Sequence, residues 1–386
     1  MASRGPTTPL LLGPDELKVV GLASGCALLV AALRSHFRDR DFDVFYASAL
    51  NLANHLDPYV GKLASVNTNP PHLVAVMMPL TLFGRDMAYW VWTAISVACI
   101  AWAVRLAVRK CQLRITGGTV AVFLAFSGTF YQLASGQVAW FLTLPMTVAW
   151  SLGSTTMAGV LIGLCASIKP FLFLFGVYFL FKRQWVPVFG MALGAMSAVL
   201  LGVATVGFSA YVSWVQTLRD LNTAFLYSNG SLFGIVARMD QPGGLFLITP
   251  GLARGLWIAM AAAVCAVTFS RLRRQTDPDQ EWALVLVTAM LMSPLGQPYY
   301  LALVLGPLWK TLGQLDKPRW GLGVSGLFWW PNVLTSPAIP TEPWQLVTYN
   351  LTTLGLISLW AVIAFSKPRT LEQPSSRFEQ ALAQSL

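Results

Sequence analysis

Long apolar runs recur along nearly the whole sequence and restrict its fold more than any other feature. Many are near the roughly 20 residues that a helix needs to cross about 30 Å of hydrocarbon. Only 11% of the residues are charged and the mean hydropathy is +0.60, whereas a soluble domain carries about 25% charged residues. Lipid offers backbone groups no hydrogen-bond partner, and the runs lack the short alternation of a membrane barrel. An all-α polytopic membrane protein is therefore expected, with residues 1–370 as one domain.

Short basic clusters between the apolar runs predict which loops face the cytoplasm. These clusters account for the net charge of +10, so no nucleic-acid partner is expected. They are Lys182 with Arg183, then Arg271, Arg273 and Arg274, and then Lys310, Lys317 and Arg319. On this scheme residues 16–35 are the first span, and residues 36–70 and 209–244 are outer loops. Residues 293–298 and 331–343 also face outward, and residues 371–386 form a flexible cytoplasmic tail.

Two segments fit the scheme poorly, and each leaves two interpretations open. Residues 71–83 are too short for a span, yet the basic residues near 105–114 should lie inside. Either the short run is a half-helix at the outer face, which we favour, or the basic cluster lies outside. The run from 157 to 181 is interrupted by Lys169-Pro170. It forms either two short helices meeting at Lys169 near the outer face, or one kinked span with the charge deeper in the membrane.

Acidic side chains on the outer side are the first candidates for chemistry. Asp41 and Asp43 begin a segment that is expected to form a helix along the membrane interface, directly after the first span. They could cap this helix and pair with Arg38 or Arg40. One of them could also act as a general base toward an acceptor hydroxyl. The two roles are compatible.

Three cationic or polar side chains are candidates for binding a lipid phosphate. Lys169 is a lone ammonium in an apolar stretch, where a charge is costly and tends to serve a function; the alternative is snorkelling to the interface. Arg238 lies in the second outer loop and either contacts phosphate or is solvated. His72 either donates to a phosphate or makes a local contact, and the local role is slightly favoured.

Three interruptions by small, polar or helix-breaking residues predict a polar cavity on the outer side. They are Asn69-Pro70-Pro71, Ser135-Gly136-Gln137 and the stretch from Ser293 to Gln297-Pro298. Non-helical backbone at membrane depth persists where it lines a polar cavity. No metal or other cofactor is expected. The aspartates at 39, 41 and 43 would point about 200° apart on a helix, and the five cysteines lie in separate segments without C-x-x-C spacing.

An ordered set of short motifs resembles glycosyltransferase family 87 over roughly residues 16–310. The set comprises Asp41-Phe-x-Val-Phe-Tyr, Asp57-Pro-Tyr59, Asn69-Pro-Pro71, Gly136-Gln137, Ala158 to Gly163 running to Lys169-Pro170, Lys182-Arg-x-Trp185, Asn229-x-Ser231-x-x-Gly234 and Ser293-Pro294. The resemblance implies a GT-C-type bundle of roughly 10–12 membrane helices that includes short half-helices. Asn69 stands where an aromatic residue is frequent in the family, and His72 where an apolar one is.

The family resemblance also implies an inverting, metal-independent sugar transfer from a polyprenyl-phosphate donor. It selects Asp41 as the base, with Asp43 in reserve, and Lys169 for the donor phosphate, with Arg238 or His72 assisting. The expected acceptor is a glycan or glycolipid at the outer face of the bacterial cytoplasmic membrane, among membrane lipids, with mannose as the default sugar. Expected substrate contacts are Tyr46, Tyr59, Asn69, Gln137, Tyr227, Asn229, Ser231 and Gln297.

Two other classes of protein remain open. A transporter or flippase of lipid-linked sugars would use the same cavity without chemistry, but transporters often have two matching halves and the sequence has no convincing repeat. A non-catalytic subunit of an assembly is the third possibility.

Overall fold

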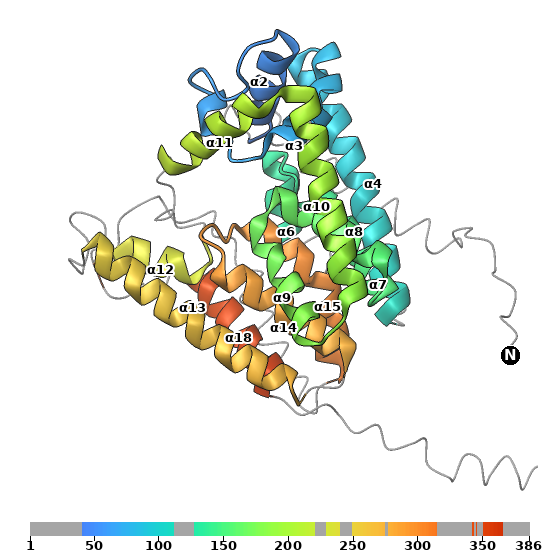
Figure 1. The fold of residues 1–386 in the computed structure, drawn as a ribbon, viewed down its shortest axis with the longest axis vertical. Coiled ribbons are helices and arrows are strands. Elements are labelled where there is room, and N and C mark those ends of the chain that lie inside the picture. The colour runs from blue at the N-terminus through green and yellow to red at the C-terminus, as the bar shows by residue number, and fades with distance from the viewer. Residues whose placement is uncertain are drawn as a thin grey trace, which may run out of the picture.

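A computed structural model describes residues 41–111, 127–220, 229–239, 249–274, 277–314, 342, 345 and 350–365. Within these ranges every regular element is a helix, which confirms the all-α membrane fold (Figure 1). The expected first span, Tyr227, the tail 371–386, Lys317 and Arg319, and parts of both outer loops lie outside the described residues.

The α-helices of the described residues differ widely in length (Figure 1). In chain order they are α2 (Asp41–Ala53), α3 (Pro71–Met77), α4 (Arg85–Cys111), α6 (Ser127–Ser135), α7 (Ala139–Leu152), α8 (Thr156–Ile168), α9 (Leu174–Phe181), α10 (Trp185–Val206), α11 (Phe208–Asp220), α12 (Leu232–Met239), α13 (Pro250–Leu272), α14 (Pro278–Met292), α15 (Leu301–Gln314) and α18 (Leu351–Phe365). Among them α4, α10 and α13 are long and apolar enough to cross a membrane.

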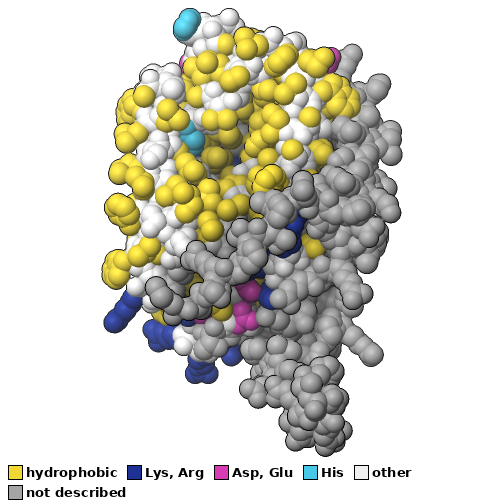
Figure 2. All heavy atoms as spheres, turned by 90° about the vertical axis from the view of Figure 1, so that its right-hand side faces the viewer, with side chains coloured by type: hydrophobic (Ala, Val, Ile, Leu, Met, Phe, Trp, Pro, Cys, Tyr) yellow, Lys and Arg dark blue, Asp and Glu magenta, His cyan; other side chains and the backbone are white. Residues whose placement is uncertain are grey.

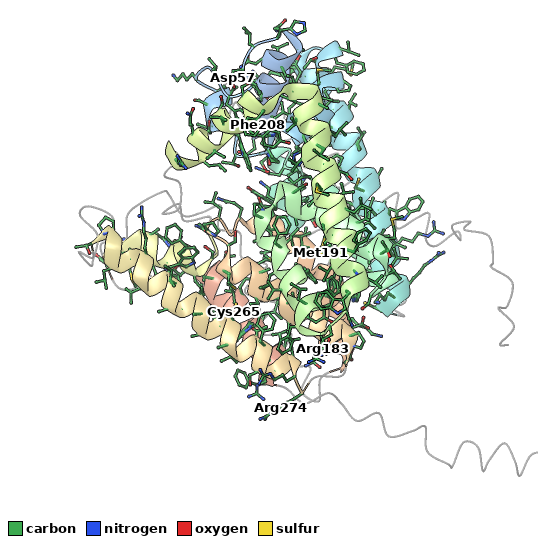
Figure 3. All side chains as sticks on the ribbon, in the orientation of Figure 1. Asp57, Arg183, Met191, Phe208, Cys265 and Arg274 are labelled. Atoms are coloured by element: carbon green, nitrogen blue, oxygen red, sulfur yellow. The ribbon has the colours of Figure 1, made fainter. Side chains whose placement is uncertain are left out.

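Basic side chains gather at one end of the bundle, which we call the basic end. Figure 3 labels Arg183 and Arg274 there, and Asp57 at the opposite end beside α2. On the face seen in Figure 2, hydrophobic side chains cover most of the described surface, and Lys and Arg gather at the lower edge. An apolar belt with cations at one end is the distribution that the positive-inside rule predicts for the cytoplasmic side.

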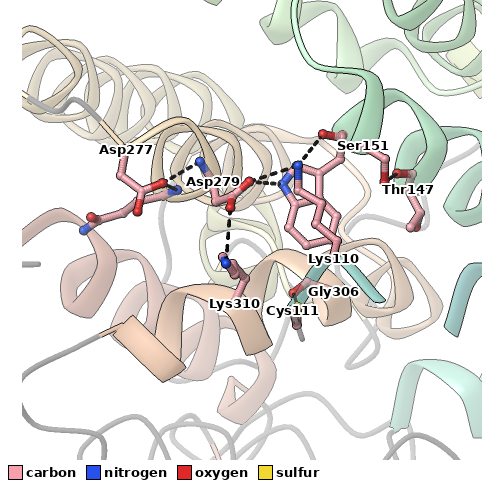
Figure 4. Close-up of polar contacts among 10 residues, drawn as sticks. Lys110, Cys111, Thr147, Ser151, Asp277, Asp279, Gly306 and Lys310 are labelled. Atoms are coloured by element: carbon pink, nitrogen blue, oxygen red, sulfur yellow. Dashed lines mark hydrogen bonds and ion pairs between the residues drawn. The ribbon is translucent and has the colours of Figure 1, made fainter. Parts of the chain in front are cut away.

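The basic end is held together by a cluster around Asp279, at the start of α14 (Figure 4). The Asp279 carboxylate lies 3.2 Å from Lys110 Nζ and 4.0 Å from Lys310 Nζ, and it accepts a hydrogen bond from Trp150 Nε1 at 2.9 Å. Ser154 adds a hydrogen bond to Gln184 at 2.8 Å, which joins the turns before α8 and α10. These contacts bring the ends of α4, α7 and α15 to the start of α14.

Several helices that reach the basic end are too short to cross a bilayer. α7, α8, α14 and α15 have 14, 13, 15 and 14 residues. At 1.5 Å per residue each is about 20 Å long, against about 30 Å of hydrocarbon. Their other ends adjoin Gln137, Lys169 and the Ser293–Gln297 stretch. Two of the three predicted interruptions, at Gln137 and at Ser293–Gln297, therefore lie part of the way along the bundle, and so does the break at Lys169.

Glycines allow α8 and α10 to pack backbone to backbone. A Cβ atom added to any of four glycines would overlap a carbonyl oxygen of the facing helix. The facing pairs are Gly159 with Pro187, Gly163 with Met191, Gly190 with Thr156 and Gly194 with Val160. Both helices carry the small-xxx-small spacing that favours close crossings in membranes. Because the sequence offset is constant along each row of pairs, the two helices run parallel.

Parallel packing decides between the two interpretations of residues 157–181. Both α8 and α10 start at the basic end, so the chain between them must return there through a short 3₁₀ turn (Pro170–Phe173) and α9. Two short helices thus meet at Lys169, and no kinked span forms. Residues 71–83 are likewise two short pieces, α3 and a 3₁₀ turn (Met78–Leu82), as the half-helix interpretation predicts.

We predict that Gly163→Ala destabilises the protein by about 1–3 kcal/mol, the usual cost of forcing an extra methyl group into a packed contact. Gly176→Ala is the matched control, because its new Cβ would lie 3.6 Å from the flexible Met191 side chain. Replacing this helical glycine should be neutral or stabilising by up to about 1 kcal/mol. Thermal unfolding in detergent measures both, and equal melting temperatures would contradict the packing described.

Candidate active site

A cavity of about 400 Å³ lies where α2, α11, the Lys169 turn and the Ser293–Gln297 stretch meet. We call it the Asp41 cavity. Its polar lining includes Asp41, Gln137, Lys169 and Gln297, four of the residues predicted from the sequence. The rest of the lining is largely apolar and aromatic. A few polar groups converging in an apolar pocket are typical of a small-molecule or lipid site.

Asp41 is the first residue of α2 and is held by the turn before α7. Gln137 Nε2 donates to Asp41 Oδ2 at 2.6 Å, and Ser135 makes a second hydrogen bond. Burial raises the pKa of the Asp41 carboxyl above its ordinary value, while the two hydrogen bonds and the positive charge of Lys169 oppose that rise. A carboxylate with a raised pKa is a stronger base than an ordinary aspartate.

Gly136 allows the start of α2 to lie close to the turn that carries Gln137. Its φ is +69°, a left-handed conformation that L side chains rarely adopt, and an added Cβ would lie 2.7 Å from the Phe42 Cβ. Trp92 Nε1 also donates to the Gly136 carbonyl at 2.9 Å. The glycine therefore lets the start of α2 come close enough for Gln137 to reach Asp41.

Lys169 ends α8 and is only 8% exposed. Pro170 disfavours helical geometry at its predecessor, and Lys169 has extended angles, φ −129° and ψ 95°. Its Nζ donates to Asn69 Oδ1 at 3.0 Å and lies 5.5 Å from the centroid of the Tyr300 ring. The ammonium therefore belongs to the cavity wall and is held from behind by Asn69, another predicted residue.

Asp43, the reserve candidate, is placed differently from Asp41. It is 4% exposed, its Oδ1 lies 3.0 Å from Arg85 Nε, and it is absent from the lining of the Asp41 cavity. Asp43 is thus paired with Arg85 of α4, a partner that was not predicted from the sequence. Arg38 and Arg40 lie outside the described residues.

His72 also lies away from the cavity lining. Its Nδ1 is 3.1 Å from the Tyr211 hydroxyl and its Nε2 is 3.2 Å from Ser167 Oγ. Burial lowers the pKa of His72 to about 4, so the ring is neutral at pH 7. The side chain links α3, α8 and α11, which corresponds to the local role.

Arg238, Asn229 and Ser231 support the cavity wall from behind. Asn229 Oδ1 accepts from Gly296 N at 2.7 Å and from Ser231 Oγ at 2.8 Å, and Asn229 Nδ2 donates to the Pro294 carbonyl at 2.9 Å. The Arg238 guanidinium donates to the Asn229 carbonyl at 3.1 Å and to Asn350. All three side chains are buried. In this structure they fix the Pro294–Gly296 backbone.

Tyr46 and Tyr59 hold backbone carbonyls outside the cavity lining. Tyr46 donates to Phe83 at 2.8 Å, and Tyr59 donates to Asn69 at 2.7 Å. Five aromatic side chains that were not among the predicted site residues line the cavity: Phe45, Phe171, Trp214, Tyr299 and Tyr300. The tyrosines directly follow Gln297-Pro298, so the predicted break was the available signal.

Comparison with known protein families identifies the family to which this chain belongs. The model of glycosyltransferase family 87 matches residues 67–294, more than half of the chain. The chain belongs to glycosyltransferase family 87. It is therefore a membrane glycosyltransferase, as the sequence motifs predicted. The matched region includes Lys169, Gln137 and the Asn229 support, whereas Asp41 and α2 lie on its N-terminal side.

A curated relative is similar over much of its length. It is the polyprenol-phosphate-mannose-dependent alpha-(1-2)-phosphatidylinositol pentamannoside mannosyltransferase of Mycolicibacterium smegmatis. The two sequences are 26% identical over 330 residues, which are 78% of this chain and 77% of the relative. Among the described residues of this family 87 member, no group of three or more His, Cys, Asp or Glu side chains is placed to hold a metal ion.

We predict that Asn229→Ala lowers the free energy of unfolding by about 1–3 kcal/mol, because the buried Gly296 N–H loses its acceptor. Asn54→Ala is the control, since Asn54 is exposed and bonds only within its own segment, to the Leu50 carbonyl. Thermal unfolding of the two variants should differ by several degrees. An Asn229 variant as stable as the wild type would refute the supporting role.

Proposed function

We propose that this chain transfers a sugar from a polyprenyl-phosphate donor to a hydroxyl of a glycan or glycolipid acceptor. Asp41 is the general base and Lys169 contacts the donor phosphate. The reaction takes place at the outer face of the cytoplasmic membrane of a bacterium, inverts the anomeric centre and needs no metal. Mannose is the default sugar, as in the name of the Mycolicibacterium smegmatis relative.

One observation carries the proposal: Asp41 and Lys169 line the same cavity. Their charges suit opposite ends of one reaction. A carboxylate can accept the proton of the acceptor hydroxyl, and an ammonium can balance the charge that gathers on the departing phosphate. The lining around them is largely apolar, and charges act more strongly in such surroundings than in water.

The proposed step is a single displacement. Asp41 takes the proton from the acceptor O–H as the acceptor oxygen forms a bond to the anomeric carbon. On the opposite face of that carbon, the bond to the phosphate oxygen breaks, and its electron pair leaves with the polyprenyl phosphate. Lys169 stabilises that oxygen. Because attack and departure occur on opposite faces, one displacement inverts the configuration.

The depth of the cavity suits a lipid-linked donor. Its wall is built on helices about 20 Å long that rise from the basic end, so the cavity lies inside the membrane thickness, toward the α2 end. A phosphate carried on a polyprenyl chain reaches this level while its chain stays in lipid. The basic end then faces the cytoplasm and the α2 end faces outward.

We expect Asp41→Asn to lower kcat by about 100-fold or more, the scale of losing a general base. Asp43→Asn is the matched control, because its charge is paired with Arg85 outside the cavity lining. The assay gives purified protein a labelled polyprenyl-phosphate sugar and candidate acceptors. Equal losses in both variants would contradict the assignment of Asp41. A wild type that translocates the lipid without transferring sugar, with translocation unchanged in Asp41→Asn, would favour a flippase.

The pH profile of kcat/KM should have an acidic limb above the ordinary aspartate range. The base must be ionised, so activity falls as pH drops through the raised pKa of Asp41. Gln137→Leu removes a hydrogen bond that lowers this pKa, and the limb should move to higher pH. Gln297→Leu, which lines the same cavity, is the control and should leave the limb in place. A limb unmoved in Gln137→Leu would argue against Asp41 as the titrating base.

A further inference from the structure

We infer that Asn67 is a positioning residue for the Lys169 ammonium, acting through Asn69 and anchored on Ser48 of α2. The inference rests on the proposed function, because it assumes that Lys169 binds the donor phosphate. Asn67 makes no hydrogen bond to Lys169 and does not itself line the cavity, although its neighbours Val66 and Thr68 do. Its effect passes through a chain of hydrogen bonds between buried side chains.

The chain has four members, and each donates to the next. Lys169 Nζ donates to Asn69 Oδ1 at 3.0 Å, and Asn69 Nδ2 donates to Asn67 Oδ1 at 3.2 Å. Asn67 Nδ2 then donates to Ser48 Oγ at 2.8 Å. The exposed fractions are 8% for Lys169, 2% for Asn69, 1% for Asn67 and 0% for Ser48. Water therefore has little access to exchange with these bonds.

The direction of the chain is fixed by the Asn69 backbone. The Asn69 backbone N–H can only donate, and it bonds to Asn67 Oδ1 at 2.9 Å. This sets the oxygen of the Asn67 amide toward Asn69 and leaves its NH₂ group for Ser48. Asn69 must then present its own NH₂ group to Asn67 and its oxygen to Lys169. An ammonium can only donate, so Lys169 and the Asn69 backbone N–H require the same orientation of the two amides.

Asn67 thereby decides whether the oxygen or the NH₂ group of the Asn69 amide meets the ammonium. If the Asn67 oxygen is removed, the Asn69 amide can rotate and turn its NH₂ group toward Lys169, a donor facing a donor. The ammonium would then lose its anchor and move within the cavity. An ammonium has three N–H donors, and Asn69 takes one of them, so a fixed anchor aims the others.

The chain also joins the proposed cation to the helix that carries the proposed base. Ser48 lies seven residues after Asp41, and residues seven apart share one face of a helix. Both the carboxylate and the end of the chain therefore belong to α2. Asn67 and Asn69 set the spacing between α2 and the Lys169 turn, on which a single displacement depends.

The test is a double-mutant cycle read by binding, with Asn67→Leu, Lys169→Met and the pair combined. The ligand is a polyprenyl monophosphate in detergent micelles. We expect Asn67→Leu to weaken its binding about tenfold, as for the loss of one well-placed charged contact. Because Asn67 acts only through Lys169, the double variant should bind no more weakly than Lys169→Met alone.

Asn51→Leu is the matched control. Asn51 also lies on α2 and ties the same outer loop to it, by donating to the Val60 carbonyl at 2.7 Å. It has no bond to the chain, so its variant should bind like the wild type. If Asn51→Leu weakens binding as much as Asn67→Leu, the effect comes from loop integrity and the inference is wrong.

Two further results would overturn the inference. One is wild-type binding in Asn67→Leu, and the other is an Asn67→Leu effect that multiplies with that of Lys169→Met. If Asn67→Leu fails to fold, as judged by thermal unfolding, Ser48→Ala replaces it, and a smaller loss in the same direction is expected. A wild type that binds no polyprenyl phosphate refutes the proposed function itself, whereas a binding wild type with the wrong variant pattern refutes only the role of Asn67.

Discussion

The parallel contact of α8 with α10 is the constraint on which the site depends. Four glycines bring the two backbones together, and because both helices rise from the basic end, the chain between them must turn back inside the bundle. Lys169-Pro170 is that turn. If α8 continued without this break, Lys169 would lie past the cavity, and the backbone groups there would form their hydrogen bonds within the helix. The broken helix leaves an ammonium and irregular backbone inside the bundle, where they need polar partners. The Asp41 cavity is the place where those partners meet.

Two groups of charged side chains, one at the basic end and one at the Asp41 cavity, are held in different ways. At the basic end, Asp279 forms ion pairs with Lys110 and Lys310 and so joins the ends of several helices. At the cavity, Asp41 and Lys169 are each held by neutral amides, Gln137 and Asn69, rather than by each other. In a direct ion pair, the charges of Asp41 and Lys169 would neutralise each other. Amide partners orient the charges and leave them able to act on a substrate, which is the arrangement expected of a preorganised site.

The fold class and the three interruptions were predictable because they are local properties of the sequence. Apolar length predicts a membrane helix, and proline or glycine predicts where it breaks. Gln137, Lys169 and Gln297 each adjoin such a break. The partners of His72 and Asp43 were not predictable, because Tyr211 and Arg85 meet them only through the packing of other helices. Tyr299 and Tyr300 were missed for a similar reason, since their position after a break does not reveal which way the rings face.

The family match begins at residue 67, and this boundary divides the site. The proposed cation and the walls that hold it belong to the matched region, whereas the proposed base lies on α2, before it. Among the contacts that cross the boundary, two connect the proposed base and cation to the other side: Gln137 donates to Asp41, and Asn67 donates to Ser48. The bond from Gln137 depends on a glycine that no larger residue could replace without pushing α2 away. The bond from Asn67 to Ser48 depends on the Asn69 backbone N–H, which can only donate and so fixes the orientation of the Asn67 amide. The relative positions of Asp41 and Lys169 thus depend on two backbone features, the conformation of Gly136 and the N–H of Asn69.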